Sequence, residues 1–433
     1  MHGRNHLLAV IVTIASALAA NTATAQGIIH PSEGKAVETD GFRLELIAKK
    51  QNFGGPARSK DEDINSPKSV NIHPDGTKYY VNSLEGMRTV VFDFQTGKKL
   101  KVIKHTFTSA DAELWAPDSG LFPFSYDKKD RNTFSGKPVE STFSHHGRYL
   151  WVPYYRRSYD INAQDPSAMA VIDTRTDEII RLFETGPLPK MITTSPDGSR
   201  IAVTHWGNNT VGVLDISSDD PQDWKYTDCY VVDYKLQLNY SRTKPVNRDV
   251  GSGYCLRGTL FTPNGKYLLV GCMGGSGGIA VIDLRSSRYL GRLTGMMSNL
   301  RHIIYKNGYL YCSINSAGYV QRTSIRNIYE AIGNLTPDRK TAPVTIWENC
   351  KVHPGARTIV SSSDGRYIFA ACNTASKISV VDTETMTMVA ALDADSFPVG
   401  LDISDDDQYL FMTAQGRSNG GGNAVDIFRF TRK

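Results

Sequence analysis

The residues of this chain that are best placed to do chemistry are basic, and they recur at one position of a repeated pattern. Each opens an apolar stretch that leads into a tight-turn sequence such as Pro-Asp-Gly. Aligned on that turn, the position reads Lys68, Val139, Lys190, Arg257, Arg301, Arg357 and Val399, so five of the seven copies are basic. Nearby acids are sparse, and Glu140 is the main exception.

Like charges that converge are costly unless a counter-ion neutralises them. Arginine suits carboxylate, sulfate or phosphate, because its planar fork can donate two parallel hydrogen bonds. The shared position therefore predicts an anion site formed by Lys68, Lys190, Arg257, Arg301 and Arg357. Solvated side chains, or side chains paired with acids elsewhere, are the alternative.

Two short segments add aromatic residues to this basic set. Tyr154-Tyr155-Arg156-Arg157 leaves one apolar stretch, and His205-Trp206 occupies the equivalent place in the next copy. Basic and aromatic side chains together suit sugars with acidic groups, or stacked bases beside phosphates. We therefore expect Tyr155, Arg156, Arg157, His205 and Trp206 to contribute to the site. A solvated loop and a structural histidine are the competing interpretations.

The sequence gives little support for catalysis. It contains neither His-Glu-x-x-His nor a haem-attachment Cys-x-x-Cys-His, the signatures of a zinc protease and of c-type haem. No cluster of carboxylates accompanies the basic residues, which argues against a divalent cation. We accordingly predict no catalytic residue, no metal ligand and no cofactor.

The elements that must position these residues form a sevenfold internal repeat, which is the first feature to seek in such a chain. A unit consists of an apolar strand, a turn ending in Asp-Gly or a relative, a second apolar strand and a third that ends in Asp. The copies span Lys68–Asp93, Val139–Asp173, Lys190–Asp215, Arg257–Asp283, Arg301–Ile314, Arg357–Asp382 and Val399–Phe428. The fifth copy lacks a recognisable third strand.

This pattern predicts an all-β fold, a seven-bladed β-propeller. Asp-Gly and Asn-Gly favour the positive φ of tight hairpin turns, and the β-branched and aromatic runs suit buried strands. One unit cannot bury its own apolar faces, whereas seven in a ring can. In a propeller the innermost strands all start at one face, here called the top, so the recurrent basic residues are expected at the top mouth of the central channel.

The repeat resembles that of YVTN-type seven-bladed propellers, on the evidence of Ser-Pro-Asp-Gly and of Val203–Asp215, which reads VTHWGNNTVGVLD. That group is similar to surface-layer repeat proteins, lactonase-like propellers and the quinoprotein amine dehydrogenase β-chain. The resemblance covers roughly Ser66 to Phe428. It is specific for the fold and weak for function, because this fold hosts enzymes, binders and scaffolds alike.

Outside the repeats, residues 1–25 read as a signal peptide, with Arg4 before the apolar run Leu7–Ala20 and a small-x-small cleavage site. Residues 26–433 are then expected to form one propeller domain, with the alternating segment Phe42–Ala48 closing the ring. A short helix is expected near Ile325–Ile332. No later segment is long and apolar enough to predict a membrane span.

The formal charge of +5 is mild and by itself says little about partners. Exported proteins can hold disulfides, and of the six cysteines Cys229 and Cys255 bracket one insertion, so they are the candidate pair.

The sequence as a whole predicts an exported, periplasmic or extracellular, non-catalytic binding propeller. Its expected partner is an anionic ligand or a cell-envelope component: an acidic glycan, a peptide or, less favoured, a nucleic-acid strand. A protein partner is a further expectation. The alternative is a lactonase-like or other hydrolytic or oxidoreductase propeller that acts on an acidic small molecule at the same mouth.

Overall fold

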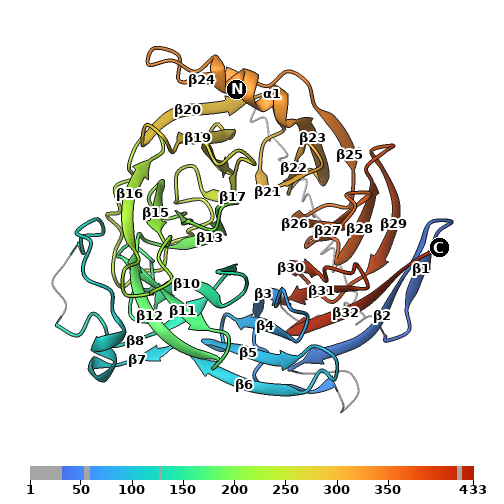
Figure 1. The fold of residues 1–433 in the computed structure, drawn as a ribbon, viewed down its shortest axis with the longest axis horizontal. Helices are drawn as coiled ribbons and strands as arrows, with labels where there is room; N and C mark the ends of the chain where they lie inside the picture. The colour runs from blue at the N-terminus through green and yellow to red at the C-terminus, as the bar shows by residue number, and fades with distance from the viewer. Residues whose placement is uncertain (1–31, 53–58, 126–128, 417–421) are drawn as a thin grey trace, which may run out of the picture.

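Seven twisted sheets stand around a central axis in the computed structural model, which describes residues 32–52, 59–125, 129–416 and 422–433 (Figure 1). The chain passes once around the ring, and the strands of each blade pair with one another and not with strands of the neighbouring blades. The predicted seven-bladed β-propeller is therefore confirmed. The predicted signal peptide, residues 1–25, lies outside the described residues.

The first three blades follow in chain order, each described from its inner strand outward. The first contains β3 (Pro67–Ile72), β4 (Lys78–Ser83), β5 (Arg88–Asp93) and β6 (Lys99–Lys104). The second contains β9 (Thr142–Ser144), β10 (Tyr149–Arg157), β11 (Ser167–Asp173) and β12 (Glu178–Thr185), with β8 (Phe134–Pro138) and β7 (Thr106–Phe107) added beside the far half of β10. The third contains β13 (Pro189–Thr194), β14 (Arg200–His205), β15 (Thr210–Asp215) and β16 (Lys225–Val231).

The remaining blades complete the ring. The fourth contains β17 (Leu256–Phe261), β18 (Tyr267–Cys272), β19 (Ile279–Asp283), β20 (Arg288–Thr294) and a parallel fifth strand, β24 (Thr341–Pro343). The fifth contains β21 (Leu300–Lys306), β22 (Tyr309–Ile314), β23 (Tyr319–Ser324) and β25 (Glu348–Lys351). The sixth contains β26 (Ala356–Ser361), β27 (Tyr367–Cys372), β28 (Lys377–Asp382) and β29 (Thr387–Asp393). The seventh contains β30 (Pro398–Ile403), β31 (Tyr409–Ala414), β32 (Ala424–Arg432), β2 (Phe42–Gln51) and β1 (Ala36–Glu38).

The first-to-second strand turns behave as their sequence predicts. In the first blade Asp75 Oδ1 accepts a hydrogen bond from the Thr77 amide at 2.9 Å, and Gly76 has φ +70°. Asparagine and aspartate make such local bonds, and glycine takes positive φ without steric cost. These turns fix the bottom face, and they place the start of every inner strand at the top.

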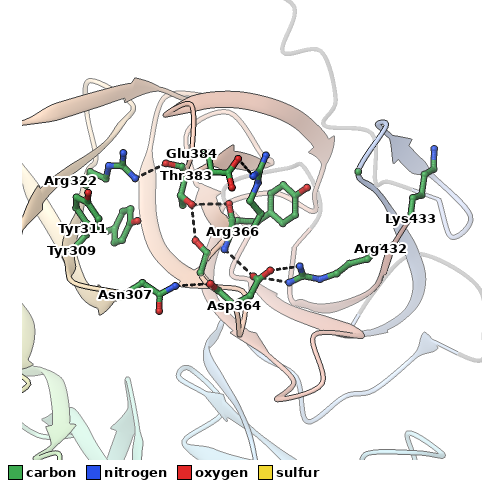
Figure 2. A pocket seen from close by; sticks show the side chains of 13 residues that line it. Asn307, Tyr309, Tyr311, Arg322, Asp364, Arg366, Thr383, Glu384, Arg432 and Lys433 are labelled. Atoms are coloured by element: carbon green, nitrogen blue, oxygen red, sulfur yellow. Dashed lines mark hydrogen bonds and ion pairs between the residues drawn. The ribbon is translucent and has the colours of Figure 1, made fainter.

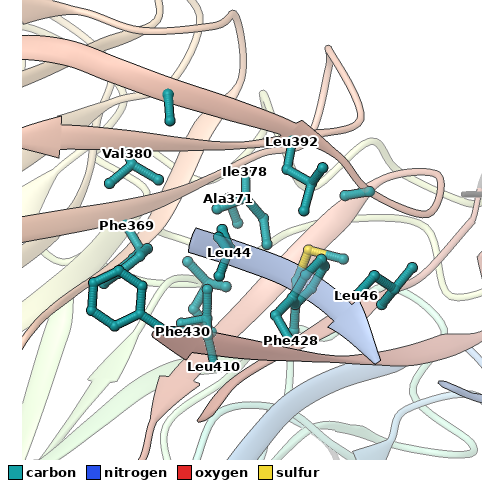
Figure 3. Packing of buried hydrophobic residues seen from close by; sticks show 14 of the residues in the cluster. Leu44, Leu46, Phe369, Ala371, Ile378, Val380, Leu392, Leu410, Phe428 and Phe430 are labelled. Carbon is teal, nitrogen blue, oxygen red and sulfur yellow. The ribbon is translucent and has the colours of Figure 1, made fainter. Parts of the chain in front are cut away.

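Strand β2 closes the ring, as its alternating sequence predicts. It pairs antiparallel with β32, so the first described segments and the last share one blade. Its inward side chains Leu44 and Leu46 are fully buried against Phe428 of β32 and Phe369 of the sixth blade (Figure 3). Burying such side chains stabilises the closure by roughly 1.5–3 kcal/mol each.

The insertions contribute two short helices. The predicted helix is α1 (Ile325–Gly333), whose first turn is capped by Ser324 Oγ accepting from the Asn327 amide at 3.2 Å. It follows β23 directly, and β23 supplies the third strand that the fifth copy seemed to lack. A 3-10 helix, η2 (Ser109–Leu114), lies in the insertion between the first two blades. None of the helices described is both long and apolar enough to cross a membrane.

Candidate functional site

The recurrent basic residue occupies the same irregular position in each of five inner strands. Lys68 is the second residue of β3, and the pairing of β3 with β4 shifts register between Pro67 and Ser69. The pairings of β13, β17, β21 and β26 with their neighbours shift at the equivalent point, around Lys190, Arg257, Arg301 and Arg357. A bulge releases a residue from the ladder and re-aims its side chain. The fold therefore turns these side chains out of the sheet at the top of the channel.

The residue that enters each of these strands has an unusual backbone conformation. Ser66, Leu188, Cys255 and Asn299 have φ of 49°, 56°, 49° and 68°, and Gly355 has 91°. Positive φ is uncommon for residues other than glycine, and such positions persist where the surrounding structure fixes them. The residue with positive φ and the bulge that follows it thus form one repeated backbone feature.

Hydroxyl groups of the adjacent blades donate hydrogen bonds to backbone carbonyls at the starts of the inner strands. Ser69 Oγ donates to the Val139 carbonyl at 2.8 Å, and Thr358 Oγ1 donates to the Val399 carbonyl at 2.6 Å. Ser313 Oγ donates to the Arg357 carbonyl in the same way. Buried carbonyls need such partners, so the bulged ends are fixed by their neighbours.

These side chains surround a cavity of about 570 Å³ at the top of the channel. Lys68, Lys190, Arg301 and Arg357 line it directly, whereas Arg257 does not. The lining includes seven basic and two acidic residues, and it also carries Tyr155, Asn315, Asn373 and Phe397. Four of the five recurrent basic residues thus lie together at this cavity.

One buried glutamate is the counter-ion at the centre of this group. Glu140 Oε1 lies 3.0 Å from an Arg257 guanidinium nitrogen and 3.4 Å from Lys68 Nζ. Burial raises the pKa of Glu140, but Lys68, Arg257 and Arg357 together hold it below its usual value. Glu140 stays ionised, and it neutralises only part of the surrounding positive charge.

Arg357 has no carboxylate partner among the described residues. Only 6% of it is exposed, its Nε has no hydrogen-bond partner, and no carboxylate of the described chain lies within the 4.0 Å ion-pair distance. Burial lowers its pKa, and the neighbouring Arg301 and Arg257 lower it further. A buried cation without a partner is costly, so this guanidinium favours an incoming anion.

The first of the two loop segments is divided between the cavity and the blade interior. Arg156 and Tyr155 line the cavity, but Arg157 is buried on the other side of β10, where its guanidinium lies 5.1 Å from the Trp115 ring and 4.9 Å from the Phe134 ring. The pairing of β10 with β8 shifts register between Tyr154 and Arg157, and such an irregularity re-aims the side chains that follow it. Arg157 therefore does not reach the cavity with its neighbours.

Neither His205 nor Trp206 lines the cavity, although the Trp206 ring contacts a residue that does. The Trp206 ring lies 5.1 Å from Lys190 Nζ, whereas His205 is buried within its blade, with Nδ1 2.8 Å from Thr210 Oγ1. Burial lowers the pKa of His205 to about 3, so it is neutral at ordinary pH. Its place is structural, and strand alternation could have separated the two residues in advance.

The repeat pattern does not reveal Arg248, which also lines the cavity. It belongs to the insertion that follows β16, and it donates to the Gly207 carbonyl at 2.9 Å while its own carbonyl accepts from Trp206 Nε1 at 2.7 Å. The neighbouring Asp249 is one of the two acids in the lining. No local sequence signal marks either residue, because their position depends on how the insertion folds back.

The proposed Cys229–Cys255 disulfide is wrong, because both thiols are free. Cys229 belongs to the outer strand β16, where it pairs with Gly212 of β15. Cys255 directly precedes the inner strand β17 of the next blade. Cys255 packs with Leu188 and Trp206 behind the cavity. The insertion that joins the cysteines thus runs from the outside of one blade to the inside of the next.

One segment formally matches the Gly-x-Ser-x-Gly pattern of esterase nucleophiles, namely 274–278, which reads Gly-Gly-Ser-Gly-Gly. It lies in the exposed turn between the antiparallel strands β18 and β19. The esterase motif requires a strand-to-helix turn that presents the serine beside a base. The segment therefore does not have the geometry of a nucleophile elbow. Nor does the described chain contain any cluster of three or more His, Cys, Asp or Glu side chains suited to a metal ion.

A larger cavity of about 710 Å³ shows how this chain pairs arginines elsewhere (Figure 2). It lies beside the turns that precede β22 and β27. Its arginines all meet carboxylates: Arg322 with Glu348 at 2.9 Å, Arg366 with Asp382 at 2.6 Å and Arg432 with Asp407 at 2.7 Å. In the top cavity, by contrast, Lys190 and Arg357 have no carboxylate of the described chain within 4.0 Å.

The fold and the site together define a seven-bladed β-propeller with a buried basic cluster at the top of its channel. No family model matches the sequence, and no curated protein matches it either, so the YVTN resemblance rests on the repeat motifs alone.

Solved structures share the fold. Hydrazine synthase of Kuenenia stuttgartiensis aligns over 87% of this chain and 99% of its own, with a TM-score of 0.59 and 14% identity. The Cps50 (Swd1) β-propeller domain of Myceliophteria thermophila aligns over 84% of this chain and 96% of its own, with a TM-score of 0.55 and 11% identity. At these identities the likeness is one of fold.

Proposed function

We propose that this chain is an exported, non-catalytic binding propeller of the YVTN kind that holds an anionic group at the top mouth of its channel. The single observation that supports this best is Arg357, a buried guanidinium that lines the cavity and has no carboxylate partner in the described chain. An anion bound there would supply the missing hydrogen bonds and charge, which are strongest away from water.

The size and lining of the cavity narrow the ligand class. About 570 Å³ falls within the usual range of small-molecule sites, roughly 300–1,000 Å³. The cavity therefore suits one acidic sugar unit, one peptide terminus or one nucleotide, and a longer polymer would enter by its end. Tyr155 and Phe397 offer apolar contact beside the charges, which fits an acidic glycan well.

An enzymatic role at this mouth finds less support. One structural neighbour is titled as a hydrazine synthase, but it shares only the fold. The acid and base nearest the channel are Glu140 and His302. Glu140 is held by two cations, and His302 Nδ1 accepts the Ile359 amide at 3.2 Å. Neither presents the free, hydrogen-bonded pair that general acid–base catalysis requires.

Calorimetric titration of the purified protein tests the proposal. The ligands are inorganic phosphate, a methyl glucuronide, an acidic peptide and a short oligonucleotide. Arg357→Met should weaken the best ligand at least about tenfold, because it removes a charge-assisted bond worth roughly 1.5–3 kcal/mol. Arg257 is a poorer choice, since its loss would also leave Glu140 less compensated.

Lys98→Met serves as the matched control, because Lys98 is exposed and does not line the cavity. It should leave the affinity unchanged. Equal affinities of wild type and Arg357→Met would refute the proposed site, as would failure of every anion to bind the wild type.

A further inference from the structure

Lys190 differs from the other lysines of the cavity in having no carboxylate partner. Lys68 lies 3.4 Å from Glu140, and Lys137 pairs with Glu85. Lys190 is 9% exposed, lines the cavity, and has no carboxylate of the described chain within 4.0 Å. Its neighbours are aromatic instead: its Nζ lies 4.1 Å from the centre of the Tyr155 ring and 5.1 Å from that of Trp206.

These surroundings favour an amine that can give up its proton. Burial lowers the pKa of Lys190 well below its usual value, and Arg257, Arg357 and Arg301 lower it further, while Asp249 acts in the opposite direction. Desolvation beside other cations is the environment that turns lysine into a nucleophile. The rings of Tyr155 and Trp206 would also stabilise a positive charge on the nitrogen of Lys190 after it has reacted.

The same cavity brings this amine and the arginines together. Arg357 and Arg301 line it with Lys190, so a ligand held by its acidic group is confined with the amine. Confinement of two reacting groups raises their effective concentration greatly. The site thus combines an anion clamp with a nucleophile.

We propose that the mouth captures acids that also carry an aldehyde or ketone, with Lys190 Nζ bonding the carbonyl carbon while Arg357 and Arg301 hold the acidic group. This inference rests on the proposed function and names its ligand class. The neutral amine adds to the carbonyl to give a carbinolamine. Loss of water then breaks the carbon–oxygen bond and leaves an imine, which takes up one proton from solvent. Nothing is oxidised or reduced, and water reverses the step.

Pyridoxal 5′-phosphate is the probe, because it joins an aldehyde to a phosphate. The purified protein is incubated with it and reduced with borohydride, which fixes any imine, and the modified lysines are identified by peptide mass spectrometry. Lys190 should carry most of the label. Pyridoxal, which lacks the phosphate, should label it at least about tenfold less, and inorganic phosphate should compete with pyridoxal 5′-phosphate.

Two variants sharpen the result. Lys190→Arg keeps the positive charge but cannot form an imine, so labelling at the cavity should disappear. Lys98→Arg, on the exposed surface, should label like the wild type. Labelling spread evenly over surface lysines, or concentrated on Lys68, would overturn the inference. If phosphate binds the wild type while Lys190 stays unmodified, the inference fails and the proposed function stands; if phosphate and the other anions do not bind, the proposed function fails as well.

Discussion

Arg357→Met should raise the stability of the protein while it removes anion binding. The wild-type guanidinium is 6% exposed, has an unpaired Nε and faces other arginines. An unsatisfied buried polar group costs about 1–3 kcal/mol, more when it is charged. Methionine keeps the apolar stem and adapts to irregular space, so the substitution should recover about 1–3 kcal/mol of unfolding free energy.

The expected shift in melting temperature follows from the size of the domain. At about 2.1 cal/mol/K per residue, an entropy of unfolding of roughly 0.8 kcal/mol/K applies to about 400 residues. The gain therefore corresponds to about 1–4 °C.

Differential scanning calorimetry in low-salt buffer without phosphate or sulfate measures this shift. Added phosphate should then raise the melting temperature of the wild type more than that of the variant, because a ligand stabilises only the state that binds it. A variant that melts below the wild type by more than about 1 °C, or that responds equally to phosphate, would refute the reasoning. Such a result would mean that Arg357 is structural.

Three further predictions concern other parts of the fold. Glu140→Gln should destabilise the protein by about 3–5 kcal/mol in thermal unfolding, because it leaves Arg257 and Lys68 buried without their carboxylate, and phosphate should restore part of the loss. Leu44→Ala should cost about 2–5 kcal/mol in the same assay, because it opens a cavity in the ring closure; a loss below about 1 kcal/mol would contradict the role of β2. Burial and the charge of Asp395 raise the pKa of Asp426 well above 3.8, so its stabilising contribution is full below about pH 3.8 and is lost as pH rises through the raised pKa. As pH rises from about 4, the melting temperature of Asp426→Asn should therefore increase relative to that of the wild type. Parallel pH profiles of the two proteins would refute this.

The fold was predictable because its determinants are local and repeated. The Asp75-Gly76 turn forms from its own side-chain bond and from the positive φ of glycine. The closing strand β2 could be recognised by its alternation, since one face had to be apolar wherever it docked. The fifth blade was less clear, because the polar sequence of β23, Tyr-Val-Gln-Arg-Thr-Ser, is held by pairing with β22 and β25 rather than by its own propensity.

The residues of the site could be predicted only where they occupy a fixed position of the repeat. Lys190 and Arg357 share a register position, so a correct fold placed them at the mouth. The place of Arg157 depends on the irregular pairing of β10 with β8 between Tyr154 and Arg157, which the sequence does not reveal. Arg248 and the free cysteines required the path of a long insertion, which follows from tertiary contacts such as that between Arg248 and Gly207. The repeat therefore predicted the residues that open the inner strands, whereas the residues from the insertion depend on how that insertion folds.

The difference in ion pairing between the arginines of the two cavities is the strongest argument for the proposal that the top cluster binds a ligand. The arginines of the larger cavity are paired with carboxylates, as for Arg432 with Asp407 at 2.7 Å and Arg322 with Glu348 at 2.9 Å. At the top, Glu140 pairs with Lys68 and Arg257, and no carboxylate of the described chain lies within 4.0 Å of Lys190 or Arg357. An anion in the top cavity would supply the partner that Arg357 lacks among the described residues, and this is the basis of the proposed function.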